Sequence, residues 1–168
     1  MIRIVCAGSL SSVSRLQKGK SARVTVVAEA AGGPEVSEKA VSGQCLCGDV
    51  KFTVGGPLRQ VLVCHCGQCR RMSGHLWAAT AAQRDAVTFQ SKDTLRWFAS
   101  SQSAERGFCN RCGSSLFWSH EGRDTLSIAA GSLDTPTGLK TEAHIYVSDA
   151  SDYYRIHPDE PTQSNLSD

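Results

Sequence analysis

Hydrophobic and polar residues alternate in short runs from residue 41 onward, as they do in β-strands. The runs are rich in β-branched and aromatic residues, and clusters of Gly, Asp, Asn and Ser separate them. Helical periodicity is weak, apart from one helical turn expected over residues 148–154. The pattern therefore predicts a mainly β domain of coiled or packed sheets. Its expected strands span residues 50–54, 58–63, 76–82, 86–90, 94–99, 105–108, 115–119, 125–130 and 143–147.

The two ends of the chain differ from this middle part. Residues 1–40 are basic, rich in Ser and poor in acidic residues, so we expect a disordered extension there; the alternatives are an organelle transit peptide and a start codon placed too far upstream. Residues 41–157 hold the strand-like runs and form the expected domain, a single one for a chain of 168 residues. Residues 158–168 are polar and contain proline, which predicts a flexible tail.

The charge and hydropathy of the chain exclude several classes of protein. The formal net charge is +2, which is too small for a general attraction to nucleic acid or to an anionic membrane. No apolar run reaches the roughly 18 residues that a transmembrane helix needs. These observations predict a soluble protein that acts without nucleic acid or membrane partners. If its cysteines are metal thiolates rather than disulfides, the protein is also expected to be cytoplasmic, because the cytoplasm is reducing.

Seven of the eight cysteines gather in three short clusters, and these clusters are the most informative feature of the sequence. A disulfide framework is one interpretation, because small secreted domains are rich in cysteine. However, cysteines this close in sequence are poorly placed to pair with each other, whereas CxC and CxxC spacings suit convergence on one metal ion. A hydrophobic fraction of 40% and the lack of a convincing signal peptide also favour metal binding. The clusters are Cys45-x-Cys47, Cys64-x-Cys66-x-x-Cys69 and Cys109-x-x-Cys112.

The seven thiolates divide into one closed and one open zinc site. Structural zinc takes four protein ligands, whereas catalytic zinc takes three and keeps one position open. Two cysteine pairs make up a closed site, and each pair is followed by a glycine, Gly48 or Gly113, that lets the backbone turn round the ion. The predicted closed site uses Cys45, Cys47, Cys109 and Cys112, and the predicted open site uses Cys64, Cys66 and Cys69.

The fourth ligand of the open site is expected to come from outside the protein, as water or a thiol. His65 alternates away from its flanking cysteines if this segment is extended. A protein ligand remains the alternative, and the candidates for it are Cys6, His75 and His144.

Three thiolates on Zn²⁺ leave a single negative formal charge, which suits a soft thiol better than the generation of hydroxide. A thiol bound at the open position would be deprotonated and nucleophilic at neutral pH. Arg70 and Arg71 follow the triplet directly and could offset its charge or hold a carboxylate; the alternative is that they are solvated surface residues. Ser73 and His75 are the nearest other polar candidates for a substrate pocket.

The order of these motifs resembles the glutathione-dependent formaldehyde-activating enzyme family, which includes centromere protein V-like proteins. The resemblance rests on GxCxCG, CHCxxCR, FCxxCGSxL, AGSLD and HIYV, and it spans residues 43–156. It implies a single-domain, zinc-stapled β-tent of coiled antiparallel sheets. It also implies a carbon–sulfur lyase that joins formaldehyde to glutathione, giving S-(hydroxymethyl)glutathione.

Carried over by position, the resemblance assigns both zinc ions. It places the structural ion on the two cysteine pairs and the catalytic ion on the triplet, with glutathione as co-substrate and an aldehyde as partner. Two features depart from the family pattern. Residues 151–154 replace the usual tryptophan after the HIF/HIY segment, and the forty-residue extension has no counterpart in the short enzymes.

Two other functions are alternatives to the enzyme. A non-catalytic zinc module could act as an adaptor that binds nucleic acid or the cytoskeleton, but the N-terminal extension is short and its basic character is diluted by Glu29, Glu35 and Glu38. A zinc-dependent nucleic-acid deaminase needs a Glu beside its ligands in an H-x-E…P-C-x-x-C pattern, which this chain lacks.

Overall fold

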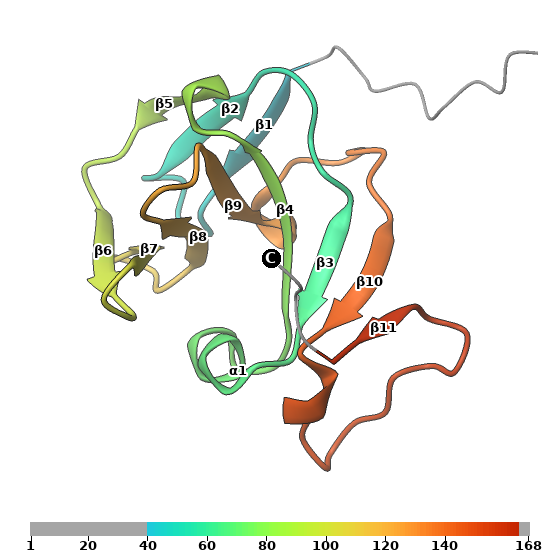
Figure 1. Cartoon of the computed structure of the whole chain (residues 1–168). Coiled ribbons are helices and arrows are strands. Elements are labelled where there is room, and N and C mark those ends of the chain that lie inside the picture. The colour runs from blue at the N-terminus through green and yellow to red at the C-terminus, as the bar shows by residue number, and fades with distance from the viewer. Residues whose placement is uncertain (1–39, 165–168) are drawn as a thin grey trace, which may run out of the picture. The chain divides into compact units, whose positions relative to one another are not determined.

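The computed structural model describes residues 40–164, and within them the chain forms two β-sheets (Figure 1). The predicted mainly β class is confirmed. Almost all of the predicted N-terminal extension, including Cys6, lies outside the described residues, as do the last four residues of the predicted tail. The smaller sheet is antiparallel with the order β1-β2-β5, and its strands are β1 (Val41–Gln44), β2 (Lys51–Val54) and β5 (Val87–Ser91).

The larger sheet has eight strands in the order β11-β10-β3-β4-β9-β8-β7-β6. The expectation of antiparallel sheets holds only in part, because β10 runs parallel to both β3 and β11. Long connections separate these partners in sequence, so no hairpin forces them to run in opposite directions. The strands are β3 (Val61–Cys64), β4 (Trp77–Gln83), β6 (Leu95–Ala99), β7 (Ala104–Cys109), β8 (Ser115–His120), β9 (Thr125–Ala129), β10 (Thr141–Ile145) and β11 (Thr162–Gln163).

The main hydrophobic core draws side chains from both sheets. Phe52 from β2 and Phe117 from β8 meet edge to face with their ring centroids 5.0 Å apart, and both are almost completely buried. Leu126 and Ile128 from β9 join the same cluster. Because alternate residues of a strand point to opposite faces, the neighbours of these residues are left to line the other face of the larger sheet.

One α-helix, α1 (Gly67–Ser73), follows β3 and was not predicted from the sequence. It is only two turns long, so it leaves too few positions for a helical period to be recognised. It ends at Gly74, whose φ of 82° lies in the left-handed region that glycine adopts readily. No helix described in residues 40–164 is long and apolar enough to cross a membrane.

Three short 3₁₀ helices complete the described elements. The turn expected over residues 148–154 is present only as η3 (Val147–Asp149), which starts one residue earlier and is shorter than predicted. The other two are η1 (Arg84–Ala86) and η2 (Ala130–Ser132).

Candidate metal centres and the adjoining cavity

The four cysteines of the predicted closed site come together, with all their sulfur atoms within 4.8 Å of one another. The Sγ of Cys47 lies 3.5 Å from that of Cys45 and 3.7 Å from that of Cys109. A tetrahedral zinc with Zn–S bonds of about 2.3 Å places its sulfur ligands about 3.8 Å apart. The donor set and its spacing therefore fit a closed thiolate metal site.

Two tight turns form this cluster and join the two sheets through it. Cys45 and Cys47 lie between β1 and β2 of the smaller sheet, whereas Cys109 ends β7 of the larger sheet. Each turn closes with a backbone hydrogen bond, from Gly48 to Cys45 at 3.0 Å and from Gly113 to Cys109 at 2.8 Å. Both glycines have positive φ, as the sequence analysis expected of residues that turn the backbone round an ion.

The cysteine triplet lies where β3 meets α1. Cys64 ends the strand, Cys66 caps the helix, and Cys69 lies within it, with their sulfur atoms within 4.8 Å of one another. The backbone N–H of Cys69 donates a hydrogen bond of 3.4 Å to the Sγ of Cys66, which holds this sulfur in place. The strand-to-helix turn thus brings three sulfur donors to one point.

Hydrogen bonding among the three thiols lowers the pKa of one of them, Cys66. The Cys64 thiol donates a hydrogen bond to the sulfur of Cys66, and this interaction lowers the pKa of Cys66 to about 2. The same hydrogen bond raises the pKa of Cys64, because it stabilises the protonated form of the donor. A thiolate, the form that binds metals, is therefore favoured at Cys66.

No histidine within residues 40–164 joins the triplet. The His65 ring is fully buried and points to other partners: its Nδ1 lies 2.7 Å from the hydroxyl of Tyr154, and its Nε2 lies 2.8 Å from the Nδ1 of His144. His75 is exposed, and its Nδ1 lies 3.1 Å from the hydroxyl of Tyr153. These contacts leave the triplet with three protein ligands among the described residues.

The triplet opens into a cavity of about 780 Å³ on the face of the larger sheet that points away from the main core. All three cysteines line it, whereas none of the four cysteines of the closed cluster does. A row of paired residues crosses the sheet on this face, and each member lines the cavity: Ala81 on β4, Ser127 on β9, Trp118 on β8 and Arg106 on β7.

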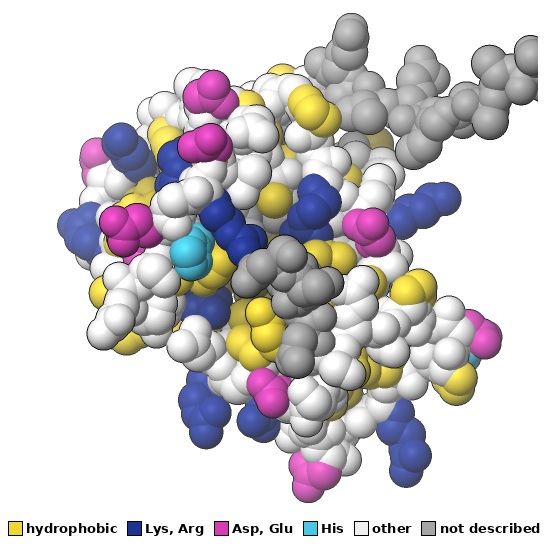
Figure 2. All heavy atoms as spheres, in the orientation of Figure 1, with side chains coloured by type: hydrophobic (Ala, Val, Ile, Leu, Met, Phe, Trp, Pro, Cys, Tyr) yellow, Lys and Arg dark blue, Asp and Glu magenta, His cyan; other side chains and the backbone are white. Residues whose placement is uncertain are grey.

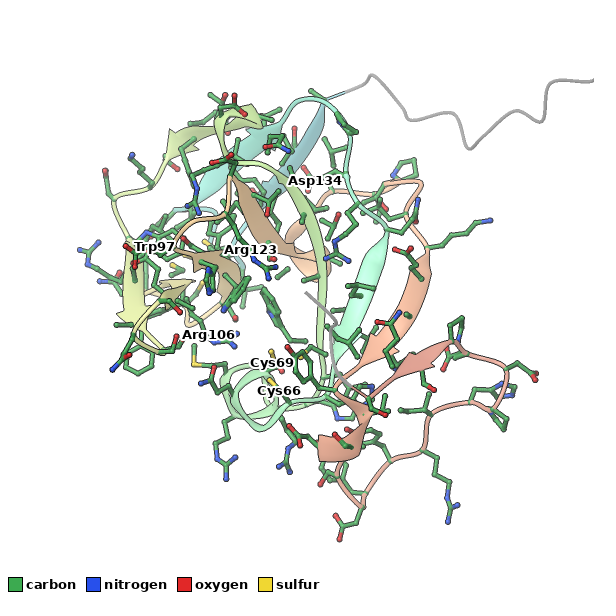
Figure 3. All side chains as sticks on the ribbon, in the orientation of Figure 1. Cys66, Cys69, Trp97, Arg106, Arg123 and Asp134 are labelled. Carbon is green, nitrogen blue, oxygen red and sulfur yellow. The ribbon has the colours of Figure 1, made fainter. Side chains whose placement is uncertain are left out.

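Arg106 is a buried cation in direct contact with the triplet. Its side chain is only 4% exposed, and its Nη2 donates a hydrogen bond of 3.5 Å to the Sγ of Cys69. The guanidinium also lies over the ring of Trp77, with its carbon 5.7 Å from the ring centroid. Among the described residues no ion pair joins Arg106 to a carboxylate, and its Nε has no hydrogen-bond partner. Figure 3 shows Arg106 beside α1, together with Cys66 and Cys69.

Two further arginines line the cavity beyond the triplet. Arg59 donates hydrogen bonds to the carbonyl oxygens of Gln60 and Ala79 at 2.9 and 3.1 Å, which fixes its guanidinium along β4. Arg123 comes from the connection between β8 and β9 and is labelled above Arg106 in Figure 3. Figure 2 shows hydrophobic side chains next to those of Lys and Arg on the side of the molecule that is turned to the viewer. The cavity therefore combines apolar walls with positive charge.

The predicted substrate-binding residues lie close to the triplet but do not line the cavity. Arg70 donates a hydrogen bond of 3.1 Å to the hydroxyl of Ser151, and Ser73 donates one of 2.9 Å to the carbonyl oxygen of Cys69. Arg71, on the exposed side of α1, contacts the carbonyl oxygen of Gly67 at 3.5 Å. The roles predicted for Arg70, Ser73 and His75 stay predictions.

Arg106, Arg59 and Arg123 were not predicted from the sequence as site residues. A signal for Arg106 was present: it stands in a strand three residues before Cys109, so alternation points its side chain to the face opposite the closed cluster. Arg59 falls in the expected strand 58–63 but precedes β3 in the structure, and Arg123 lies in the connection between β8 and β9, so alternation along a strand places neither side chain.

Comparison with known proteins places this site in a family. The model of the glutathione-dependent formaldehyde-activating enzyme family matches residues 40–149, and the chain belongs to that family. A protein of Schizosaccharomyces pombe named as an uncharacterized lyase is 27% identical over 114 residues, which are 67% of this chain and 82% of the yeast protein. A crystal structure of a Rhodobacter sphaeroides protein aligns with a TM-score of 0.49 at 20% identity, over 58% of this chain and 91% of that one.

Proposed function

We propose that this protein is a zinc-dependent carbon–sulfur lyase that joins a glutathione-like thiol to formaldehyde or a related small electrophile. The observation that carries the proposal is the contrast between the two cysteine clusters. Four cysteines form a closed set that ties the two sheets together, whereas three cysteines open into the cavity. Family membership and a distant relative named as a lyase support the same reaction class.

Cys64, Cys66 and Cys69 would hold the reactive metal, and the four remaining clustered cysteines would hold the structural one. A zinc ion at the triplet would supply a Lewis acid that lowers the pKa of a thiol bound beside it. Three thiolates with one zinc carry a single negative charge, and Arg106 is a buried positive charge in contact with Cys69. The donor set therefore fits the group that the family description implies.

The protein's own side chains would bind the reactants and exclude water. In the reaction, a sulfur–carbon bond forms, the π bond of the aldehyde carbonyl breaks, the thiol proton leaves to solvent, and the carbonyl oxygen gains a proton. Arg106, which contacts Cys69 and lines the cavity, would donate a hydrogen bond to that oxygen as negative charge develops on it. Trp77 and Trp118 form apolar walls that limit water around the reacting atoms.

The test is adduct formation above the uncatalysed rate. Thiols add to formaldehyde without help, so glutathione and formaldehyde are mixed with purified protein, with buffer, and with Cys66→Ser in matched zinc, and exchange between free and adduct states is followed by NMR. We expect acceleration by the wild-type protein alone. Equal exchange rates in the three samples would refute the proposed function.

A further inference from the structure

We propose that the electrophile carries an apolar group larger than formaldehyde, and that this group lies on the cavity wall beside the cysteine triplet. The inference rests on the proposed thiol chemistry and specifies its second reactant. Three features of the cavity carry it: its size, the position of its apolar wall relative to the sulfur atoms, and the sign of the charges that line it.

The cavity has room for a group larger than formaldehyde beside the triplet. Its volume is about 780 Å³, at the upper end of the range of about 300–1,000 Å³ for pockets that enclose drug-sized ligands. Formaldehyde has two non-hydrogen atoms, and one water molecule takes a share of about 30 Å³ in the liquid. A site built for formaldehyde would need only a small recess next to the bound thiol.

The apolar wall begins directly at the sulfur atoms. Cys64 pairs with Trp77 on β4 and with Ile145 on β10, so an apolar side chain flanks it on each side. Leu62 and Ala79, which pair with each other one step further along β3 and β4, extend the same surface. A substituent on a sulfur held at the triplet would therefore contact this wall.

The charged side chains of the cavity are all arginines. Arg59, Arg106 and Arg123 line it, and no Asp or Glu is among the described residues that do so. Carboxylates of a glutathione-like thiol can bind to these guanidinium groups, whereas its ammonium group finds no acidic partner inside. We expect the ammonium group to lie at the exposed end of the cavity, beside Gln83 and Thr125. The apolar wall is then left for the group that the electrophile brings.

Stable thioethers of glutathione test this directly, because they measure binding without any reaction. S-methyl-, S-butyl- and S-hexylglutathione are titrated into the zinc-loaded protein by calorimetry. We expect the affinity to rise about threefold to fourfold for each methylene group that the wall buries. S-hexylglutathione should bind at least about tenfold more tightly than S-methylglutathione. Equal affinities, or weaker binding of the hexyl compound, would overturn the inference.

Filling the wall should remove this preference. Ala81→Leu adds bulk on the cavity face of β4, and we expect it to weaken S-hexylglutathione binding about tenfold more than S-methylglutathione binding. Ala99→Leu is the matched control, because Ala99 is exposed on β6 and does not line the cavity. Equal weakening of both compounds in Ala81→Leu would contradict a contact specific to the apolar group.

An aldehyde series separates this inference from the proposed function. Formaldehyde, butanal and hexanal are each mixed with glutathione and the wild-type protein, and the rate above buffer is recorded. A gain in kcat/KM from formaldehyde to hexanal supports the inference. Acceleration of formaldehyde alone refutes the inference and leaves the proposed function standing. Acceleration of no aldehyde refutes the proposed function, whereas the thioether affinities still decide whether the wall binds an apolar group.

Discussion

The guanidinium of Arg106 lies 3.5 Å from the sulfur of Cys69, although the two residues come from different elements, β7 and α1. This contact links the cysteine triplet to the arginine-lined cavity. It also places a buried positive charge where three thiolates would otherwise repel one another. In the proposed function, electrostatics at this point would couple metal binding to substrate binding.

Removal of the Arg106 charge should impair the reaction more than the fold. We expect Arg106→Gln to lower kcat/KM for adduct formation by about 10- to 100-fold, because a hydrogen-bond donor to the developing negative charge is lost. Arg106→Lys should keep part of the activity, since it retains the charge but not the planar guanidinium. Arg96→Gln, at an exposed position of β6, is the control and should behave like the wild-type protein. Equal rates in Arg106→Gln and Arg96→Gln would show that Arg106 has no part in the chemistry.

Substitutions of two neighbouring residues of β8 should have different effects, one mainly on stability and the other mainly on ligand binding. Phe117 is fully buried in the main core, whereas Trp118 points into the cavity. We expect Phe117→Ala to lower the free energy of unfolding by about 3–5 kcal/mol, measured by urea denaturation. Trp118→Ala should cost less stability and should weaken S-hexylglutathione binding. The opposite ranking of the two stabilities would contradict the assigned faces of this strand.

The partly buried hydrogen bond between Tyr154 and His65 should contribute to the stability of the fold beside the triplet. Tyr154→Phe leaves the Nδ1 of His65 without its partner at 2.7 Å, and we expect a loss of about 1–3 kcal/mol in the free energy of unfolding. Tyr153→Phe is the matched control, because Tyr153 is 58% exposed and its hydrogen bond to His75 lies at the surface. A change within about 0.5 kcal/mol is expected there. Equal losses of stability in the two variants would show that the hydrogen bond between Tyr154 and His65 contributes no more than the exposed one.

The sequence allowed the metal clusters to be predicted better than the cavity. Cysteine spacing is a local property, and the same two sets, of four and of three, come together in the structure. The mainly β class also follows from local alternation, as Leu126 and Ile128 illustrate on one face of β9 and Ser127 on the other.

The features that could not be predicted depend on long-range pairing. The parallel arrangement of β10 beside β3 joins segments separated by most of the domain, and no local pattern specifies it. The contact between Arg106 and Cys69 likewise requires β7 and α1 to meet across the larger sheet. The helix α1 is too short to show a period, so the spacing of its cysteines predicts a metal site although the hydrophobic pattern predicts no helix there.

The most direct test is the metal stoichiometry of three proteins: the wild type, Cys66→Ser and Cys109→Ser. It shows whether one cysteine cluster holds a structural metal and the other a catalytic metal. We expect about two zinc ions per chain in the wild-type protein and about one in Cys66→Ser, with an unchanged circular dichroism spectrum. Cys109→Ser should lose the fold as well as its metal, because Cys109 is fully buried in the cluster that joins the two sheets. Full metal retention in Cys66→Ser, or its global unfolding, would contradict this division.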